Sequence, residues 1–346
     1  MKCFLLFFAI IFLFLLCLRN PIEEPSNLNL MRNKAVSAVH ILVLVLTLNL
    51  FSPSSFSQSI TSGNGKFEIG FGFGPMFFLG DLGGSAGIGK DFLKDVDFPL
   101  TKISKTLYAN YYPAEWLGFR IALNHGQLKG DDAQAPDKGG AERFRIDRNL
   151  SFKSSVLEAY IAAEVYPTVF FERYDGLQGK FRPYGLIGAG VYKFNPKAKL
   201  DGQWVALQPL HLEGQGLIPG KKDYKLIQAE IPMGLGFKYF IKENMYVGFE
   251  ILHRQLFTDY VDDVSTTYPD PIIFNSLPAA DVAKAKRLYY RGNELPQARQ
   301  TPGVNEQRGD ITDNDAFFAT ILRFGWRLNN DQNSLARKQM RCPVFY

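Results

Sequence analysis

Cysteine is scarce in this sequence, with 3 residues in 346 and no CxxC pair. Two of them, Cys3 and Cys17, lie near the start, and Cys342 lies near the end, so the chain is no disulfide scaffold. A body without thiols suits an oxidising envelope compartment. Long apolar runs are also missing, because no run of about 18 apolar residues occurs beyond residue 51. Together with a mean hydropathy of −0.09, this excludes a polytopic helical membrane protein.

Basic stripes and catalytic motifs are missing as well. Lysine and arginine number 39 against 34 acidic residues, and no cluster of them marks a nucleic-acid footprint, so we expect no nucleic-acid partner. No GxSxG or HExxH occurs, and we expect no catalytic residue, no cofactor and no enzyme activity. What the sequence does contain is 46% apolar residues and 31 glycines. That content can build a core, which excludes disorder over most of the chain.

Two short apolar runs occupy the N-terminal region. Phe4–Leu18 is the first, and Ile41–Phe51 follows a basic stretch that begins at Met31. The second run, with small residues before Gln58, has the anatomy of a secretory signal. We therefore expect residues 1–57 to be an extension plus a cleaved signal peptide, with translation starting at Met31. The alternative is that Phe4–Leu18 is an anchoring helix.

The rest of the chain alternates in hydrophobicity with a period of two, which predicts strands with one apolar face. Phe119, Ile121 and Leu123 share one face, whereas Arg120 and Asn124 share the other. Eight segments show this pattern, two of them (103–112 and 182–194) with mixed phase: 66–74, 103–112, 116–126, 156–166, 182–194, 226–240, 245–254 and 316–327.

The second face and the connections decide what kind of sheet this is. The second face holds glycine, alanine and charge, which is typical of a barrel with its apolar side toward lipid. Short connections alternate with long ones, as periplasmic turns and extracellular loops do. We therefore expect an all-β, antiparallel transmembrane β-barrel of eight strands in the bacterial outer membrane. It would span residues 66–328, after a periplasmic lead-in at 58–65 and before a periplasmic tail at 329–346, with outer-membrane lipid around it.

Charged residues on the second face would point into the narrow lumen. The inward carboxylates are Glu68, Glu158, Glu164, Glu230 and Glu250, and the inward cations are Arg120, Lys238, Arg254, Arg323 and Arg327. Unpaired charge is costly in such a lumen, so we expect an ion-pair network, with Glu250 and Arg254 in contact. Its role would be to close the lumen as a plug of side chains. A charged, conducting channel is the alternative.

Aromatic residues gather next to the short connections, where an interfacial girdle belongs. The expected girdle residues are Tyr111, Tyr112, Trp116, Tyr166, Tyr239, Phe240 and Trp326. Ordinary sheet packing by large side chains is the alternative explanation for this clustering.

One acidic group stands out where the seventh strand ends. Asp259, Asp262 and Asp263 together offer the oxygen ligands that Ca²⁺ prefers, but no EF-hand spacing accompanies them. A solvated or cation-bridged loop base is the alternative. We therefore retain these three residues as a weak Ca²⁺ candidate and expect no other metal site.

Several short sequence segments together resemble a known family. They are Phe67–Gly70, Tyr111–Gly118, Ile231–Gly236, Thr258–Ser265 and Met340–Pro343. The chain is similar in them to the PorG-like outer-membrane β-barrels of Bacteroidetes, one type of which belongs to the type IX secretion machinery. The resemblance implies a non-enzymatic barrel that meets a periplasmic ring made of a lipoprotein and its partner. A structural component of an envelope or secretion complex is thus the expected function. The alternative is a stand-alone barrel acting through its extracellular loops, adhesin-like or porin-like.

Overall fold

The computed structural model describes residues 67–82, 101–114, 116–134, 142–170, 181–242, 244–297 and 301–328. The expected signal peptide, the lead-in at 58–65, the tail at 329–346 and Cys342 lie outside these residues. The described residues all belong to one compact unit, Ile60–Tyr346.

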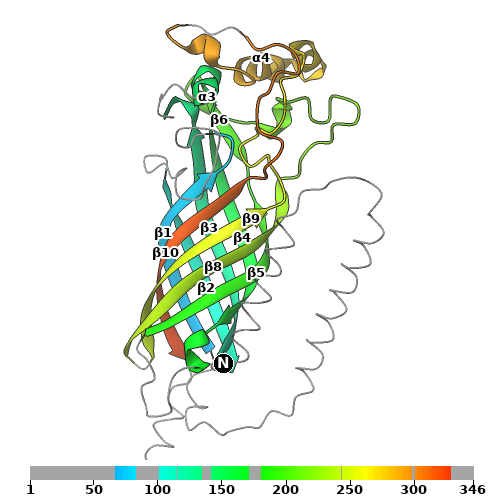
Figure 1. The fold of residues 1–346 in the computed structure, drawn as a ribbon. Helices are drawn as coiled ribbons and strands as arrows, with labels where there is room; N and C mark the ends of the chain where they lie inside the picture. Colours follow the sequence, from blue (N-terminus) through cyan, green and yellow to red (C-terminus); the bar gives the residue numbers. More distant parts are fainter. Residues whose placement is uncertain are drawn as a thin grey trace, which may run out of the picture. The chain divides into compact units, whose positions relative to one another are not determined.

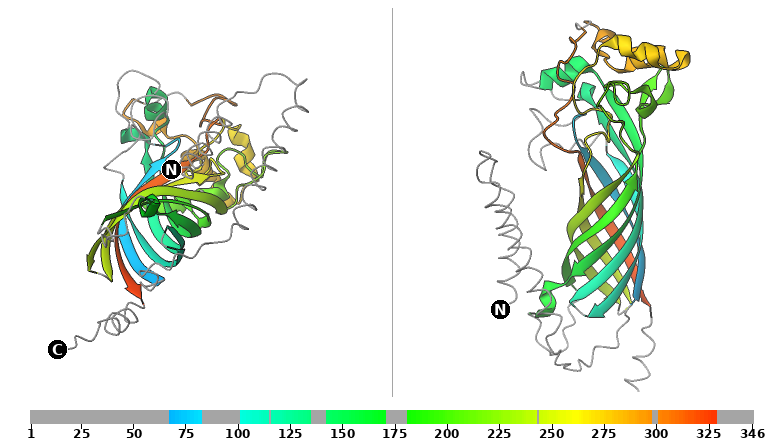
Figure 2. Two further views of the ribbon diagram at one scale, coloured as in Figure 1. Left: turned by 60° about the horizontal axis from the view of Figure 1, so that its bottom comes forward. Right: turned by 90° about the vertical axis from the view of Figure 1, so that its right-hand side faces the viewer.

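Eight long strands form a closed antiparallel barrel (Figures 1 and 2). They are β1 (Phe67–Leu79), β2 (Lys102–Ala114), β3 (Leu117–Asp131), β4 (Ser151–Val165), β5 (Phe181–Lys193), β8 (Ile227–Lys242), β9 (Met245–Leu256) and β10 (Ala316–Leu328). Each pairs with the next barrel strand, and β1 also pairs with β10, so no barrel strand is left at an open edge. The predicted eight-stranded barrel is confirmed.

The two faces of the barrel wall differ as predicted. Ile121 is 64% exposed and Leu235 is 72% exposed on the outside, whereas Arg120 and Glu158 are 1% and 0% exposed on the inside. Exposed apolar side chains surround the barrel, and charged side chains are buried within it. Strands of 12 to 16 residues are long enough to cross a bilayer at a tilt. The fold is thus that of an outer-membrane barrel.

The connections have the predicted asymmetry. β2 and β3 are separated by two residues, and so are β8 and β9. At the opposite end several strands run further than predicted, since β4 begins at Ser151 and β1 continues to Leu79. Beyond the lipid-facing band the sequence no longer alternates in hydrophobicity, but the strands continue and remain paired.

The long loops carry their own secondary structure. It comprises the strands β6 (Pro196–Leu200) and β7 (Gln203–Ala206), the helices α3 (Glu142–Arg148) and α4 (Ala279–Leu288), and the short 3-10 helices η3 (Asp132–Gln134), η5 (Gln208–Leu210), η6 (Pro271–Ser276) and η7 (Gly292–Glu294). A further 3-10 helix, η4 (Pro167–Phe170), lies at the periplasmic end. No helix among the described residues is long and apolar enough to cross a membrane.

We call the folded loop layer the extracellular cap; it comprises the described residues of 80–82, 132–150, 194–226 and 257–315. Figure 1 shows α3, β6 and α4 together at one end of the barrel. Buried residues from three loops, including Leu150, Leu212 and Leu288, belong to the same apolar core. The cap is therefore a packed layer in which separate loops share a core.

Candidate functional site

Buried charge in the barrel interior divides into two groups. The periplasmic cluster comprises Glu68, Glu164, Glu250, Arg120, Lys238, Arg323 and Arg327. The outer cluster, nearer the cap, comprises Glu158, Glu230 and Arg254. All ten side chains point inward, and their positions along the strands decide to which cluster each belongs. The periplasmic cluster has four cations for three carboxylates, and the outer cluster has one cation for two carboxylates.

Glu250 is the centre of the periplasmic cluster. Its Oε2 atom accepts hydrogen bonds from Arg120 Nη1 at 2.7 Å, Arg323 Nη1 at 2.9 Å and Tyr184 OH at 2.6 Å. These donors come from β3, β10 and β5, whereas Glu250 lies on β9. Arg120 also donates from Nε to Glu164 at 2.6 Å. Arg120 and Tyr184 therefore reach Glu250 from strands that do not pair with β9. The Arg323–Glu250 and Arg120–Glu164 contacts join neighbouring strands.

Lys238 fills the lumen nearer the periplasm. Its ammonium lies 2.8 Å from Glu68 Oε2 and 3.3 Å from Glu164 Oε2. Tyrosine rings surround it at 4.8 to 5.5 Å, which adds cation–π attraction. Arg327 donates to the other oxygen of Glu68 at 2.9 Å. Charged and aromatic side chains are thus packed against one another in this part of the lumen.

The outer cluster is less complete. Arg254 donates to both oxygens of Glu158 at 3.1 and 3.2 Å, and Asn124 donates to Glu158 at 3.1 Å. Glu230 is 1% exposed, yet neither of its carboxylate oxygens has a hydrogen-bond partner among the described residues. Gly190 lies beside it, where an added Cβ would come within 2.8 Å of Glu230 Oε1. The only cation of this cluster is already bound to Glu158.

One predicted contact is wrong. Glu250 and Arg254 share a strand face, but Glu250 binds Arg120 and Arg323, whereas Arg254 binds Glu158. Residues four apart on a strand are separated by about 13 Å, which is too far for a side-chain pair. Arg120 and Glu158 come from across the lumen, and Arg323 comes from the neighbouring strand β10.

The predicted girdle is partly wrong. Tyr111, Trp116, Tyr239 and Trp326 are 37 to 47% exposed and face outward, as an interfacial girdle requires. Three of the predicted residues point inward instead: Tyr112, Tyr166 and Phe240. Tyr112 and Tyr166 hydrogen-bond Glu164, and Phe240 stacks under the Arg327 guanidinium at 4.1 Å. Consecutive strand residues face opposite sides of a sheet. Tyr112 follows the outward Tyr111 and Phe240 follows the outward Tyr239, so both must face inward.

In the cap, the first ionic hub is Arg148. It binds both oxygens of Asp132 at 2.8 and 3.0 Å and also donates to the Asp81 carbonyl at 2.8 Å. A further hydrogen bond goes to the carbonyl of Arg308. Arg148 and Asp132 belong to the second long loop, Asp81 to the first and Arg308 to the fourth. One guanidinium therefore connects three loops.

The second hub is the buried pair of Arg308 and Glu213. Arg308 Nη1 lies 2.9 Å from Glu213 Oε1 and 2.6 Å from the Asp263 carbonyl. Glu213 also accepts the backbone N–H groups of Ser265 and Thr266 at 2.9 and 3.0 Å. The pair thus attaches the third loop to the fourth and, through Arg148, to the other two.

The acidic trio is not arranged as a cation site. No group of three metal-ligating side chains is placed to hold a metal ion in the described part of the chain. Asp262 accepts from Leu82 N at 3.0 Å and Val264 N at 2.9 Å, and Asp263 accepts from Tyr224 OH at 2.7 Å. Asp262 and Asp263 are each 0% exposed, so the alternative of a solvated loop base is wrong for them. These carboxylates satisfy loop backbone and a tyrosine.

Burial changes the titration of the cap carboxyls. Burial, reinforced by the charge of Asp81, raises the pKa of Asp262 well above its usual range. It also raises the pKa of Asp263 to about 7 and that of Asp81 to about 6. For Asp259, burial and the neighbouring charges of Asp81 and Asp262 raise the pKa to about 9. The folded cap therefore favours protonated carboxyls.

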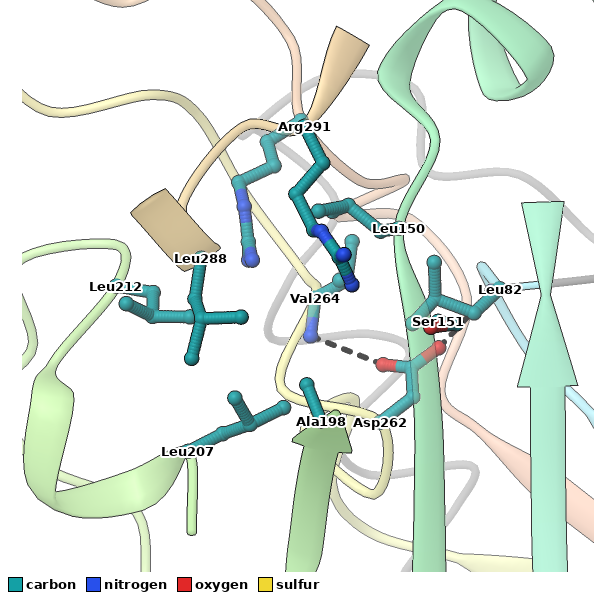
Figure 3. Close-up of a pocket in the computed structure, with 11 residues that line it drawn as sticks. Leu82, Leu150, Ser151, Ala198, Leu207, Leu212, Asp262, Val264, Leu288 and Arg291 are labelled. Carbon is teal, nitrogen blue, oxygen red and sulfur yellow. Dashed lines mark hydrogen bonds between the residues drawn. The ribbon is translucent and has the colours of Figure 1, made fainter. Parts of the chain in front are cut away.

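A small cavity lies in the cap core. Figure 3 shows it lined by residues from all four long loops, among them Leu82, Leu150, Leu212 and Val264. Its volume is enough for about one water molecule and too small for an organic ligand.

Comparisons with known proteins give only structural likenesses. No protein-family model matches the chain, and no curated protein matches it. The crystal structure of Ail, the attachment invasion locus protein of Yersinia pestis, matches at 10% identity and TM-score 0.34, over 77% of this chain and 99% of that one. The outer membrane protein OprG of Pseudomonas aeruginosa matches at 12% identity and TM-score 0.36, over 77% and 98%. Likenesses at these values carry no argument about function, so the assignment as a barrel rests on its strand pairing and exposed apolar band.

Proposed function

We propose that this chain is a non-enzymatic, non-conducting outer-membrane barrel, exported by the N-terminal signal, whose extracellular cap binds a ligand or partner at the cell surface. The observation that carries the proposal is the cap itself. Arg148 and Arg308 join all four long loops through buried contacts, and the loops share one apolar core. A surface that is already ordered loses little conformational entropy on binding.

The occupied lumen supports the non-conducting part of the proposal. Arg120, Lys238 and Arg323 are each 1% exposed and bind carboxylates on other strands, and Arg120 and Lys238 reach strands that do not pair with their own. Purified protein in a planar bilayer should give no steady ion conductance. Stable single-channel steps from the wild-type chain would refute a closed lumen.

A second candidate is a structural component of an envelope complex, such as the type IX secretion machinery. It is supported by the resemblance to PorG-like barrels, strongest in Thr258–Ser265. That segment lies in the cap, where Asp262, Asp263 and Ser265 make the buried contacts described above. The partner expected for this function, a periplasmic lipoprotein ring, would contact the short turns or the tail instead.

Affinity purification of the full chain from solubilised outer membranes separates the two candidates. One variant, Arg308→Met, loosens the cap, and a matched variant lacks residues 329–346. Loss of a surface ligand with the first variant alone supports the cap-binding function. Loss of a periplasmic partner with the second alone, together with a defect in protein secretion, supports the complex. A chain that retains no ligand or partner, and whose deletion leaves secretion and surface binding intact, contradicts both.

A further inference from the structure

Three lysines lie on adjacent strands at the boundary between the barrel wall and the cap. Lys129 of β3 pairs with Lys153 of β4, and Lys153 pairs in turn with Lys197 of β6. We call these three residues the lysine row. Paired residues on adjacent strands share one face with Cβ atoms about 5 Å apart, so the three lysine side chains leave the sheet from adjacent positions on one face.

The positive charge of the lysine row is only partly compensated by the described residues. Each of its side chains is partly exposed, and none forms an ion pair with the described residues. Asp131, two residues beyond Lys129 on the same strand, attracts Lys129 and also accepts the backbone N–H of Ala133 at 3.2 Å. One carboxylate thus faces three lysines. Like charges directly opposite one another destabilise a sheet. An external anion would remove that repulsion.

The position of the row points to lipid. On the same strands and the same face, Ile121, Leu123 and Leu157 are 55 to 64% exposed and form the lipid-facing band. The row begins where that band ends. Between the two lie His125 and, paired with it on β2, Lys105, which are both exposed.

An exposed tryptophan completes the patch. Trp204 of β7 is 47% exposed, and the Lys153 ammonium lies 5.2 Å from the centre of its ring. Tryptophan is enriched at the level of lipid headgroups because its ring is amphipathic. Basic side chains at that level attract anionic headgroups.

We propose that Lys129, Lys153 and Lys197, flanked by Trp204, bind the phosphorylated headgroup of an anionic lipid in the outer leaflet. The site is continuous with the lipid-facing band, so a lipid can fill it while its acyl chains lie on the strands below. A soluble polyanion would have no such second contact. Lys197 and Trp204 belong to the cap, whereas Lys129 and Lys153 belong to barrel strands, so the site lies where the cap meets the barrel wall.

The test measures lipid retention by native mass spectrometry of the purified full chain in detergent. The probes are bisphosphorylated lipid A and its dephosphorylated form, each mixed with phosphatidylcholine. Wild-type protein should retain the phosphorylated lipid, and the triple variant Lys129→Gln, Lys153→Gln, Lys197→Gln should retain it about tenfold less. Lys153→Gln alone should give a smaller loss and serves if the triple variant does not fold. Added salt should weaken retention because the attraction is between charges.

The matched control replaces three exposed lysines outside the patch: Lys222→Gln, Lys242→Gln, Lys286→Gln. This variant should retain lipid like the wild type. Equal retention by wild-type and row variants, or equal retention of the two lipid forms, would overturn the proposal. Binding of soluble polyphosphate with no preference for the lipid would overturn it too.

Discussion

The periplasmic cluster and the hubs of the cap are both buried ionic networks, but they stabilise the molecule in different ways. In the cluster, side chains bind side chains, as Arg120 and Arg323 bind Glu250, between strands whose backbones are already hydrogen-bonded. In the cap, charged groups bind backbone, as when Arg148 binds the Asp81 carbonyl and Glu213 binds Ser265 N. The charged side chains of the lumen pack the barrel interior. Those of the cap form hydrogen bonds with loop backbone groups that no regular secondary structure would otherwise satisfy.

The largest effect is expected from Glu250→Leu. The change leaves Arg120 and Arg323 buried without their shared carboxylate, and breaking a buried pair in this way costs about 3–5 kcal/mol. The free energy of unfolding should fall by that amount in urea titrations in lipid vesicles. Asp201→Asn, which removes an exposed pair with Arg287, is the control and should leave stability nearly unchanged because solvent screens exposed charges. A similarly small change for Glu250→Leu would mean that water replaces the carboxylate.

Arg148→Met should open the cap and leave the barrel intact. It removes the contacts to Asp132 and to two loop carbonyls, so the free energy of local opening should fall by about 3 kcal/mol. Limited proteolysis within the cap should accelerate strongly, while the heat-modifiable mobility of the folded barrel stays unchanged. Loss of both together would show that cap and barrel unfold as one unit.

Two isosteric variants compare the carboxylates of the outer cluster. Glu158→Gln should destabilise the barrel by about 2 kcal/mol because it weakens a buried charged hydrogen-bond pair. Glu230→Gln should be neutral or stabilising, since the Glu230 carboxylate has no hydrogen-bond partner among the described residues. Urea midpoints of the two variants, measured side by side, check the order. The reverse order would mean that Glu230, and not Glu158, is the principal partner of Arg254.

The last expected effect is a pH dependence of the cap. The pKa of Asp81 is raised from 3.8 to about 6, that of Asp263 to about 7 and that of Asp259 to about 9. The folded cap therefore holds protons that the unfolded loops release. This part of its stability is complete below the ordinary pKa of 3.8 and is lost as pH rises through these raised values. Amide hydrogen exchange in the cap should accelerate with pH by more than the intrinsic pH dependence of exchange. In the Asp259→Asn variant, the extra acceleration at the highest pH values should be smaller. A cap that becomes more stable over this range would contradict the prediction.

The alternation of strand residues between the two faces of the sheet made much of the barrel predictable from sequence. Period-two alternation gives the face on which each strand residue lies, so the inward position of Glu250 or Arg323 follows directly. Partner choice depends on how the tilted strands place side chains across the lumen, which alternation does not encode. That is why the Glu250–Arg254 contact was wrong although both residues were placed on the correct face.

The cap was harder to predict because loops have no period. One local signal existed, since Asp201-Gly202 is a favoured two-residue turn. Both residues have positive φ, 48° and 83°, and they join β6 to β7. The hubs gave no such signal, because Arg148, Glu213 and Arg308 are far apart in sequence. The lysine row was missed for the same reason, as its members form no cluster along the chain.

The seam between β1 and β10, where Phe67 pairs with Leu328, has a consequence for biogenesis. A chain that stops before Ala316 would leave β1 and β9 with unpaired backbone groups facing hydrocarbon, each costing several kcal/mol. Such a nascent chain has no stable state in the bilayer. Insertion must therefore wait until the final strand has been synthesised and delivered, so a truncated product is rejected at the membrane before any loop has a chance to act.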